Sequence, residues 1–225
     1  MNAVTLLRAE AGSAPSGTGS FNYFSNFLVV VENLAYNKLV GIWGHEVGAG
    51  TWSFYPCSYS HSVPGNNEIW NTSTGESRID QFDVEYQVLG NVYWDNNSNY
   101  NYIMDIAAAE GTNGVGTAVI NPPVLAVSWG IDAAGNLNVE VLVKNLAFQK
   151  QVAIIYTTNN WLTFFNVFGK YERSFAPPTM PHQVQTELWN IAAPVGLNKS
   201  GVFAVFYVVN NTTYWDNNFG LNYSF

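Results

Sequence analysis

The chain has 225 residues, a formal net charge of −8 and only 8 Lys and Arg residues, a balance that argues against nucleic acid or an anionic membrane surface as partner. Charged residues make up 11% of the chain, against about 25% in an ordinary soluble domain, while aromatic residues reach 16%. A surface built from amides, hydroxyls and aromatic edges suits a neutral polar ligand such as a sugar, although an ordinary Asn- and Thr-rich β protein has the same composition.

The N-terminal region has no basic segment followed by a long apolar run, so no secretory signal is predicted. No stretch approaches the roughly 20 apolar residues of a membrane helix. We therefore expect no membrane insertion and favour a cytoplasmic or non-classically exported protein. The single cysteine, Cys57, excludes an intrachain disulfide, and the three histidines show no metal-ligand spacing, so no cofactor is expected.

The first half of the chain reads as short strands joined by tight turns. Residues 81–88 alternate, with Phe82, Val84, Tyr86 and Val88 on one face and polar residues on the other, as in a half-buried strand. Residues 89–91 predict a hairpin turn into the stretch 93–97, Tyr-Trp-Asp-Asn-Asn.

The second half repeats two landmarks of the first in the same order. Residues 33–38, Asn-Leu-Ala-Tyr-Asn-Lys, answer residues 145–150, Asn-Leu-Ala-Phe-Gln-Lys. The stretch Tyr-Trp-Asp-Asn-Asn returns at residues 214–218, after a turn at 210–211. Residues 150–156 and 201–209 are rich in β-branched and aromatic residues and predict further strands. Two ordered matches indicate an internal duplication.

No segment carries a long helical period, so we predict an all-β chain of two tandem antiparallel, immunoglobulin-like β-sandwiches. The first is expected over residues 1–110 and the second over 124–225. Between them the Gly-rich residues 111–116 and the pair Pro122-Pro123 predict a flexible connection over 111–123. The Ala-rich residues 103–110 before it suit either a short helical turn or an edge strand.

These motifs resemble the family 21 carbohydrate-binding modules, a family that includes starch-binding domains and glycogen-targeting subunits. The resemblance rests on residues 145–150, on Asn160-Trp161 and on the final run 214–223, Tyr-Trp-Asp-Asn-Asn-Phe-Gly-Leu-Asn-Tyr. It covers about 124–225 closely and about 20–103 less tightly. The family fold is an antiparallel β-sandwich, in agreement with the strands predicted above.

The resemblance implies two kinds of glucan site. Aromatic plates of one site correspond to Trp52 and Trp94 in the first half and to Trp161 and Trp215 in the second; the aromatic residues of another correspond to Tyr36 and Phe148. A third plate of some members is replaced by Asp83 and Ala204, and Asn99 stands where the second half has Gly220. Asn tolerates the left-handed backbone that glycine favours, so we expect the turn to be kept.

Sugar chemistry fits the residues around these plates. A flat Trp covers the C–H face of a pyranose, and Asp and Asn side chains exchange hydrogen bonds with its hydroxyls. The hydrogen-bonding candidates are Asp95, Asn96, Asn97, Asn101, Asp216, Asn217, Asn218 and Asn222. Tight-turn chemistry is the alternative role for the same residues. Tyr93 and Tyr214 should point to the opposite face of their strands, into the core.

We therefore predict a non-catalytic tandem binder of an oligo- or polysaccharide, with a starch- or glycogen-like α-glucan as the first choice of ligand. A lectin for a non-glucan glycan and a subunit that targets a partner enzyme to a glucan are the alternatives. Catalysis is not expected, because glycosidases pair two carboxylates about 5–10 Å apart, whereas Asp95 and Asp216 are equivalent residues of separate halves.

Overall fold

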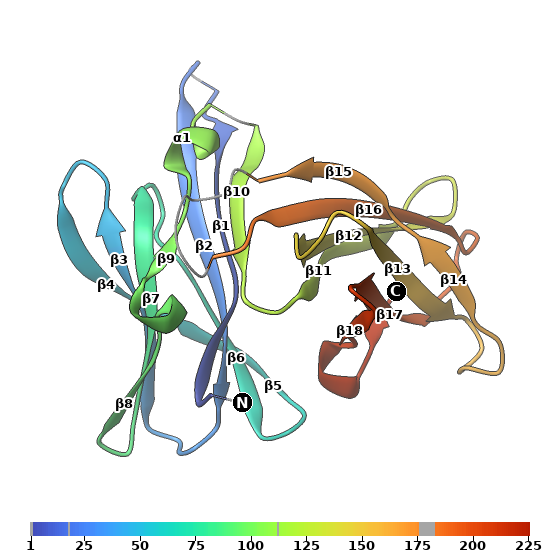
Figure 1. Ribbon diagram of the computed structural model, residues 1–225, viewed down its shortest axis with the longest axis horizontal. Coiled ribbons are helices and arrows are strands. Elements are labelled where there is room, and N and C mark those ends of the chain that lie inside the picture. The colour runs from blue at the N-terminus through green and yellow to red at the C-terminus, as the bar shows by residue number, and fades with distance from the viewer. Residues whose placement is uncertain (1, 18, 112, 176–182) are drawn as a thin grey trace. The chain divides into compact units, whose positions relative to one another are not determined.

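The computed structural model describes residues 2–17, 19–111, 113–175 and 183–225, and the regular secondary structure of these residues is almost entirely β-strand (Figure 1). They divide into two compact units, unit 1 (residues 1–121 with 175–185) and unit 2 (residues 122–174 with 186–225). Each unit has its own hydrophobic core. The all-β prediction is confirmed. In the described ranges, no helix is long and apolar enough to cross a membrane.

Unit 1 packs two antiparallel sheets face to face. One has the strand order β10-β1-β2-β6-β5 and the other the order β4-β3-β7-β8, with β9 beside β7. The strands are β1 (Val4–Pro15), β2 (Phe21–Glu32), β3 (Lys38–Glu46), β4 (Thr51–Pro56), β5 (Ser58–Val63), β6 (Asn67–Ser73), β7 (Ile79–Val88), β8 (Asn91–Asp95), β9 (Tyr102–Ile103) and β10 (Gly114–Ile120).

Unit 2 has the same plan. Its sheets have the orders β11-β12-β16-β15 and β14-β13-β17-β18, with β19 beside β17. The strands are β11 (Val124–Ile131), β12 (Asn136–Lys144), β13 (Lys150–Thr157), β14 (Phe165–Phe168), β15 (Lys170–Ser174), β16 (Thr186–Pro194), β17 (Val202–Val209), β18 (Thr212–Asp216) and β19 (Tyr223–Ser224).

The alternating strand of the first half is β7, and its apolar face builds the core of unit 1. Phe82, Val84, Tyr86 and Val88 are all buried, as the alternation predicts. Two-residue turns close the β7–β8 and β17–β18 hairpins at residues 89–90 and 210–211, and all four turn residues have positive φ. Two consecutive residues with positive φ are typical of the two-residue turns whose twist matches that of the flanking strands. Both predicted hairpins are therefore confirmed.

The predicted flexible connection at 111–123 is wrong for most of its length. Residues 114–120 form β10, which pairs antiparallel with β1 and completes a sheet of unit 1. The glycines that suggested flexibility have a packing role instead, since a Cβ on Gly116 would lie 2.1 Å from the carbonyl oxygen of Ala108. Ala108 belongs to the short helix α1 (Ile106–Ala109), which Asp105 caps by accepting from the Ala108 N–H.

Unit 1 also includes a segment that follows much later in the sequence. The side chain of Gln183 accepts from the Ile103 N–H at 2.9 Å and donates to the Ile103 carbonyl at 2.7 Å. This side-chain amide thus pairs with β9 as a neighbouring strand would. Phe175 and residues 183–185, which the sequence predicts to lie in the second sandwich, group with unit 1.

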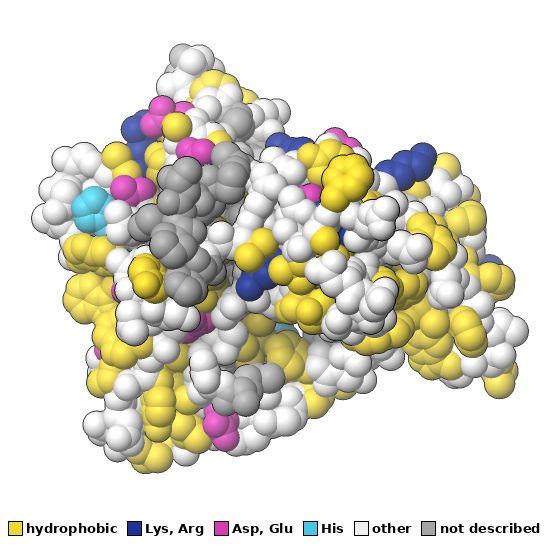
Figure 2. All heavy atoms as spheres, viewed as in Figure 1, with side chains coloured by type: hydrophobic (Ala, Val, Ile, Leu, Met, Phe, Trp, Pro, Cys, Tyr) yellow, Lys and Arg dark blue, Asp and Glu magenta, His cyan; other side chains and the backbone are white. Residues whose placement is uncertain are grey.

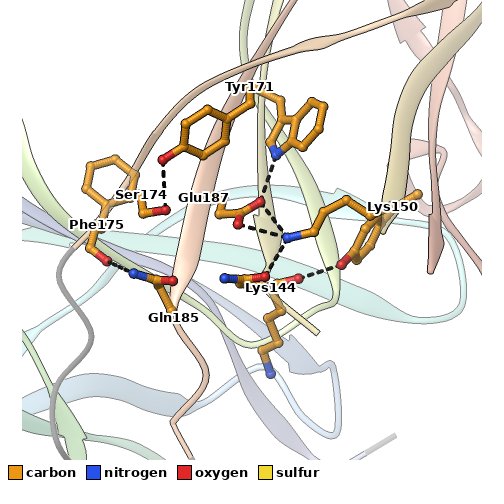
Figure 3. Close-up of polar contacts among 10 residues, drawn as sticks. Lys144, Lys150, Tyr171, Ser174, Phe175, Gln185 and Glu187 are labelled. Carbon is orange, nitrogen blue, oxygen red and sulfur yellow. Dashed lines mark hydrogen bonds and ion pairs between the residues drawn. The ribbon is translucent and has the colours of Figure 1, made fainter. Parts of the chain in front are cut away.

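A buried polar network recurs in both units, and it gives a structural role to the Asn and the Lys of the Asn-Leu-Ala-aromatic-polar-Lys motif. In unit 2 the Lys150 ammonium donates to Asn145 Oδ1 and to both Glu187 oxygens, at 2.8 Å each, while Trp189 Nε1 donates to Glu187 at 3.0 Å (Figure 3). The Lys150 and Glu187 side chains are only 4% and 7% exposed.

Unit 1 repeats this network residue for residue. The Lys38 ammonium donates to Asn33 and, at 2.7 Å, to Glu68, and Trp70 Nε1 donates to Glu68 at 3.0 Å. A buried tyrosine hydroxyl nearby is also repeated: Tyr86 donates to the Glu32 carbonyl, as Tyr207 does to that of Lys144 in unit 2. The Asn and Lys of the motif therefore hold the first sheet to the second within each unit.

We expect Lys150→Met to lower the free energy of unfolding of unit 2 by about 3–5 kcal/mol, because it leaves the Glu187 carboxylate buried without its cation. Urea unfolding followed by tryptophan fluorescence measures this. Lys170→Met, at an exposed lysine of the same unit, is the control. The double variant Lys150→Met/Glu187→Leu should recover much of the loss; if it is as unstable as the single variant, the unpaired charge is not the cause.

Candidate functional site

The tryptophans of the repeated Tyr-Trp-Asp-Asn-Asn stretch are exposed on the outer face of their units. Trp94 of β8 lies opposite Glu85 of β7, and Trp215 of β18 lies opposite Phe206 of β17. Their exposed fractions are 44% and 55%. Both indoles therefore present a large apolar surface to a ligand. In Figure 2 hydrophobic side chains gather over the β7–β8 hairpin and, separately, over β13 and β14.

The residues on either side of each tryptophan face inward. Tyr93 and Tyr214 are partly buried and pack against the cores of their units, as predicted. Their rings lie 5.9 and 6.0 Å from those of Tyr86 and Tyr207. Each tryptophan is thus the outward residue between two inward ones.

The aspartate after each tryptophan is bound by its own unit. Asp216 accepts from the Ala126 N–H at 2.7 Å, from the Tyr223 hydroxyl at 2.8 Å and from the Asn218 N–H at 3.2 Å. Burial raises the pKa of Asp216, although these donors oppose the rise, and burial beside Asp216 raises that of Tyr223. The carboxylate ties the last hairpin of unit 2 to its first strand.

Asp95 makes the corresponding contacts in unit 1. Its carboxylate accepts from the Leu6 N–H at 2.7 Å, from the Tyr102 hydroxyl at 2.8 Å and from the Asn121 side chain at 3.2 Å. The hydrogen bonds of both predicted aspartates therefore run into the fold, which is the structural alternative considered for them.

The asparagines that follow build a left-handed turn. Asn97, Ser98, Asn99 and Asn101 all have φ between 50° and 69°. The Asn96 side-chain Oδ1 accepts from the Asn99 N–H at 3.1 Å, and the Asn97 side-chain amide donates to the Asn101 backbone carbonyl at 2.9 Å. Asn is one of the few residues other than glycine that adopt this backbone readily. The expectation that Asn99 keeps the turn is confirmed.

Unit 2 repeats the turn with Asn217, Asn218 and Asn222. Asn217 accepts from the Gly220 N–H at 3.0 Å, and the Asn218 amide donates to the Asn222 carbonyl at 3.1 Å. Asn218 and Asn222 have φ of 50° and 58°. The repeated asparagines thus have a demonstrated role in the backbone, and sugar contact by their remaining polar atoms stays a prediction.

A surface pocket of about 260 Å³ opens on the outer face of the β4-β3-β7-β8 sheet. It is lined by Trp43, Trp52, Asp83, Trp94 and Asn101. The structure therefore brings together three residues that the sequence analysis selected, Trp52, Trp94 and Asn101. The other two were missed.

Asp83 is the charged group of this pocket. The side-chain amide of Asn101, with its nitrogen toward β7, donates to both Asp83 oxygens at 3.1 Å. Burial and the nearby Asp95 carboxylate raise the pKa of Asp83 from 3.8 to about 6. Two residues further along β7, Glu85 is buried and accepts from the Trp43 indole and the Gln87 amide. Acidic groups and indoles therefore share this face.

The equivalent face of unit 2 has no acid in these positions. Ala204 and Phe206 of β17 stand where β7 has Asp83 and Glu85. The rings of Trp215, Phe206 and Phe168 form a chain, with centroids 5.4 Å and 6.3 Å apart along it. The two units thus present the same platform tryptophan beside different neighbours.

The remaining predicted plates lie in loops. Trp161 is 39% exposed and has a φ of 66°, with its N–H donated to the Thr157 hydroxyl. Tyr36 and Phe148, the aromatic residues of the repeated motif, are 97% and 99% exposed. Aromatic residues in such a motif often pack in the core, but this exposure excludes core packing for Tyr36 and Phe148.

Sequence reasoning missed Trp43, Asp83, Phe168 and Phe206 as residues of these faces. The resemblance did place Asp83 at the position of a third aromatic plate, but the acid was read as the loss of that plate and not as a residue of the site. Trp43 lies directly opposite Asp83 on β3, so the pairing of two non-adjacent strands was needed to find it. Phe206 could be found from the outward register of β17, opposite Trp215.

Comparison with known proteins identifies the class to which the second half is similar. Residues 127–225 match the family model described as a carbohydrate/starch-binding module (family 21). The match begins within β11 and runs to the last residue of the chain.

Two curated relatives match in part. Glucoamylase 1 of Rhizopus oryzae is 32% identical over 108 residues, covering 43% of this chain and 18% of the relative. Protein phosphatase 1 regulatory subunit 3B of Xenopus tropicalis is 35% identical over 86 residues, covering 37% of this chain and 27% of the relative. The chain therefore spans only about a fifth to a quarter of the length of these relatives.

Two solved structures are also similar. The starch-binding domain of Rhizopus oryzae glucoamylase, solved in complex with beta-cyclodextrin and maltoheptaose, is 26% identical with a TM-score of 0.37; the match covers 47% of this chain and 94% of that one. The carbohydrate-binding module of the muscle glycogen-targeting subunit of Protein Phosphatase-1 is 18% identical with a TM-score of 0.35, over 45% of this chain and 73% of that one.

Asp216→Ala should lower the free energy of unfolding of unit 2 by about 2–4 kcal/mol, because the Ala126 N–H and the Tyr223 hydroxyl lose their acceptor inside the unit. Urea unfolding measures this, with Glu140→Ala, at an exposed acid of the same unit, as control. A loss no larger than that of the control would contradict the anchoring role.

Asp83 should make unit 1 less stable as the pH rises. Its pKa is about 6 when folded against 3.8 ordinarily, so the folded state binds more protons between those values. Its contribution to stability is therefore complete below about pH 4 and lost as the pH rises through 6. Asp83→Asn should raise the free energy of unfolding at pH 7.5 by roughly 1 kcal/mol, with solvent screening allowed for, and leave it unchanged near pH 4. Equal effects at both pH values would exclude this.

Proposed function

We propose that this chain is a non-catalytic tandem carbohydrate-binding protein that binds glycans on Trp94 and Trp215, with an α-glucan as first choice of ligand. The observation that carries the proposal is the exposure of one indole at the same place in both units, between an inward tyrosine and a bound aspartate. A rigid, exposed tryptophan covers the apolar face of a pyranose with little loss of side-chain entropy.

The family match supports this proposal for unit 2, and the description of that family as a starch-binding module supports the choice of glucan. For unit 1 the support comes from its likeness to unit 2 of the same chain. The buried Lys–Glu–Trp network, the tyrosine hydroxyl and the bound aspartate recur there with the same partners. We therefore propose that unit 1 is a second module of the same family, and that the domain limits follow the two units.

Two kinds of site follow from the exposed aromatic residues. The first comprises the platform tryptophans with Trp52 in unit 1 and Trp161 in unit 2, and the second comprises Tyr36 and Phe148. With a site in each unit, the second binding event on a multivalent glycan is intramolecular. The overall affinity can then exceed the affinity of a single site by roughly 10²–10⁴. In this proposal the asparagines of the two turns, Asn101 above all, supply the hydrogen bonds to the sugar hydroxyls.

A targeting subunit is the second candidate function. The observation that favours it is the partial match to a regulatory subunit of protein phosphatase 1. In that case the glucan sites would be the same, and a partner enzyme would bind elsewhere on the chain. Capture of a phosphatase on glycogen beads that carry the chain, and not on glycogen beads without it, distinguishes this candidate from a free-standing lectin.

We expect Trp215→Ala and Trp94→Ala each to weaken retention by soluble starch or glycogen in affinity gel electrophoresis by at least tenfold, and the double variant to abolish it, because each removes a stacking surface. Tyr59→Ala and Tyr171→Ala are the controls. Tyr59 and Tyr171 are exposed to 52% and 51% and lie on the other sheet of their units, each beside a tryptophan.

Wild-type retention by the double tryptophan variant, with its fold intact by circular dichroism, would refute the platform assignment. Binding of the wild type to a glycan array but to neither polymer would move the proposal to the lectin for a non-glucan glycan. Release of reducing sugar from a bound glycan would contradict the non-catalytic assignment.

A further inference from the structure

The two units differ most in what lies beside the platform tryptophan. In unit 1 the pocket is lined by three indoles, one carboxyl group and one amide, and none of the lining residues is Lys or Arg. In unit 2 the equivalent positions are apolar, with Ala204 in place of Asp83. If the units are copies of one scaffold, as proposed above, the acid is the feature that one copy has and the other lacks.

Asp83 is free to accept further hydrogen bonds. Each carboxylate oxygen has about two acceptor positions, and the Asn101 amide reaches both oxygens with one nitrogen. Glu85 differs, since it is buried and does not line the pocket. The Asp83 carboxylate is therefore the acidic group that faces the pocket with capacity left for a ligand.

Indoles beside a carboxylate form a site for a cation. The face of an indole attracts an ammonium group within about 6 Å of its centroid, and a nearby carboxylate adds ion pairing and a hydrogen-bond acceptor. A neutral glucan gains nothing from Asp83 that a hydroxyl or amide could not supply. A bound neutral glucan would also desolvate the Asp83 carboxylate further, although burial and Asp95 already disfavour its charge.

We propose that the pocket of unit 1 selects glycans that carry protonated amino groups, such as oligomers of unacetylated amino sugars, with Trp94 stacking on the sugar ring and Asp83 accepting from its ammonium group. This inference rests on the proposed glycan binding and names the ligand class of one of its sites. Unit 2, whose face has no acid at the equivalent position, keeps the neutral glucan.

The charges around Asp83 set the pH dependence of this site. Asp95 lies behind it on β8 with the Tyr102 hydroxyl of β9, Glu85 follows on its own strand, and β3 and β4 contribute the neutral rings of Trp43 and Trp52. The nearest histidine on β3, His45, is paired with Asp80 at 2.7 Å. With a pKa of about 6, Asp83 is charged at pH 7 and largely protonated at pH 5. The contribution of Asp83 to binding of the amino sugar should therefore weaken as the pH falls from 7 to 5. Because the sugar amine also titrates near neutral pH, this contribution is measured as the difference between the wild type and Asp83→Asn.

The test is isothermal titration calorimetry of the full chain with three tetrasaccharides, one of glucosamine, one of N-acetylglucosamine and one of maltose type, at pH 7 and 150 mM salt. The glucosamine tetramer should bind at least tenfold more tightly than its acetylated form. Asp83→Asn, which keeps the size and a partner for Asn101, should remove that preference. Glu76→Gln, at an exposed acid of the same unit, is the control for general attraction of a cation to an acidic protein.

A preference that survives Asp83→Asn, or that Glu76→Gln reduces equally, overturns the inference. So does a wild-type chain that binds the maltose-type tetramer but not the glucosamine tetramer, and in that outcome the proposed function stands. If the chain binds glucosamine through Asp83 and Trp94 and no glucan, the choice of glucan fails while this inference holds. The second readout is the pH dependence between 5 and 7: the affinity of the wild type relative to Asp83→Asn should fall as the pH falls, with an unchanged circular dichroism spectrum, and a constant ratio overturns the inference.

Discussion

The outer tryptophan face of each unit depends on one buried contact, in which a carboxylate at the end of the Trp-bearing hairpin accepts a hydrogen bond from the backbone of the first strand. Asp216 accepts from Ala126 N–H and Asp95 accepts from Leu6 N–H, both at 2.7 Å. Because successive residues of a strand face opposite ways, fixing the aspartate inward fixes the preceding tryptophan outward. The exposed indole is thus positioned by a polar anchor beneath it, and the direction of its side chain is set by the fold.

A second buried network explains why two units with different surfaces keep the same frame. The ammonium of Lys150 is held by Glu187 within a shell that excludes water, and Lys38 is held by Glu68 in the same way. Removing either partner of such a pair is costly, whereas changing a residue on the outer face is not. This division of constraints leaves positions such as Asp83 open to change, and it is on the outer face that the two units differ.

The sequence predicted what is local and missed what depends on distant pairing. The hairpins at 89–90 and 210–211 follow from turn residues and alternation, and the exposure of Trp94 follows from the same alternation. The glycines of 114–120 were misread because a small residue serves a close contact as well as it serves flexibility. Trp43 could not be placed beside Asp83 without knowing that β3 pairs with β7. The grouping of residues 183–185 with unit 1 likewise has no local signal.

The scarcity and burial of lysine have a consequence for how this protein can be handled. Within the sequence of unit 1 the lone lysine is Lys38, whose side chain is 3% exposed and bound to Glu68. In unit 2 Lys150 is equally enclosed, whereas Lys170 and Lys199 are exposed. Apart from the α-amino group, amine-directed coupling to a sensor surface or a fluorophore should therefore attach through unit 2, and the tryptophan pocket of unit 1 should stay chemically unmodified.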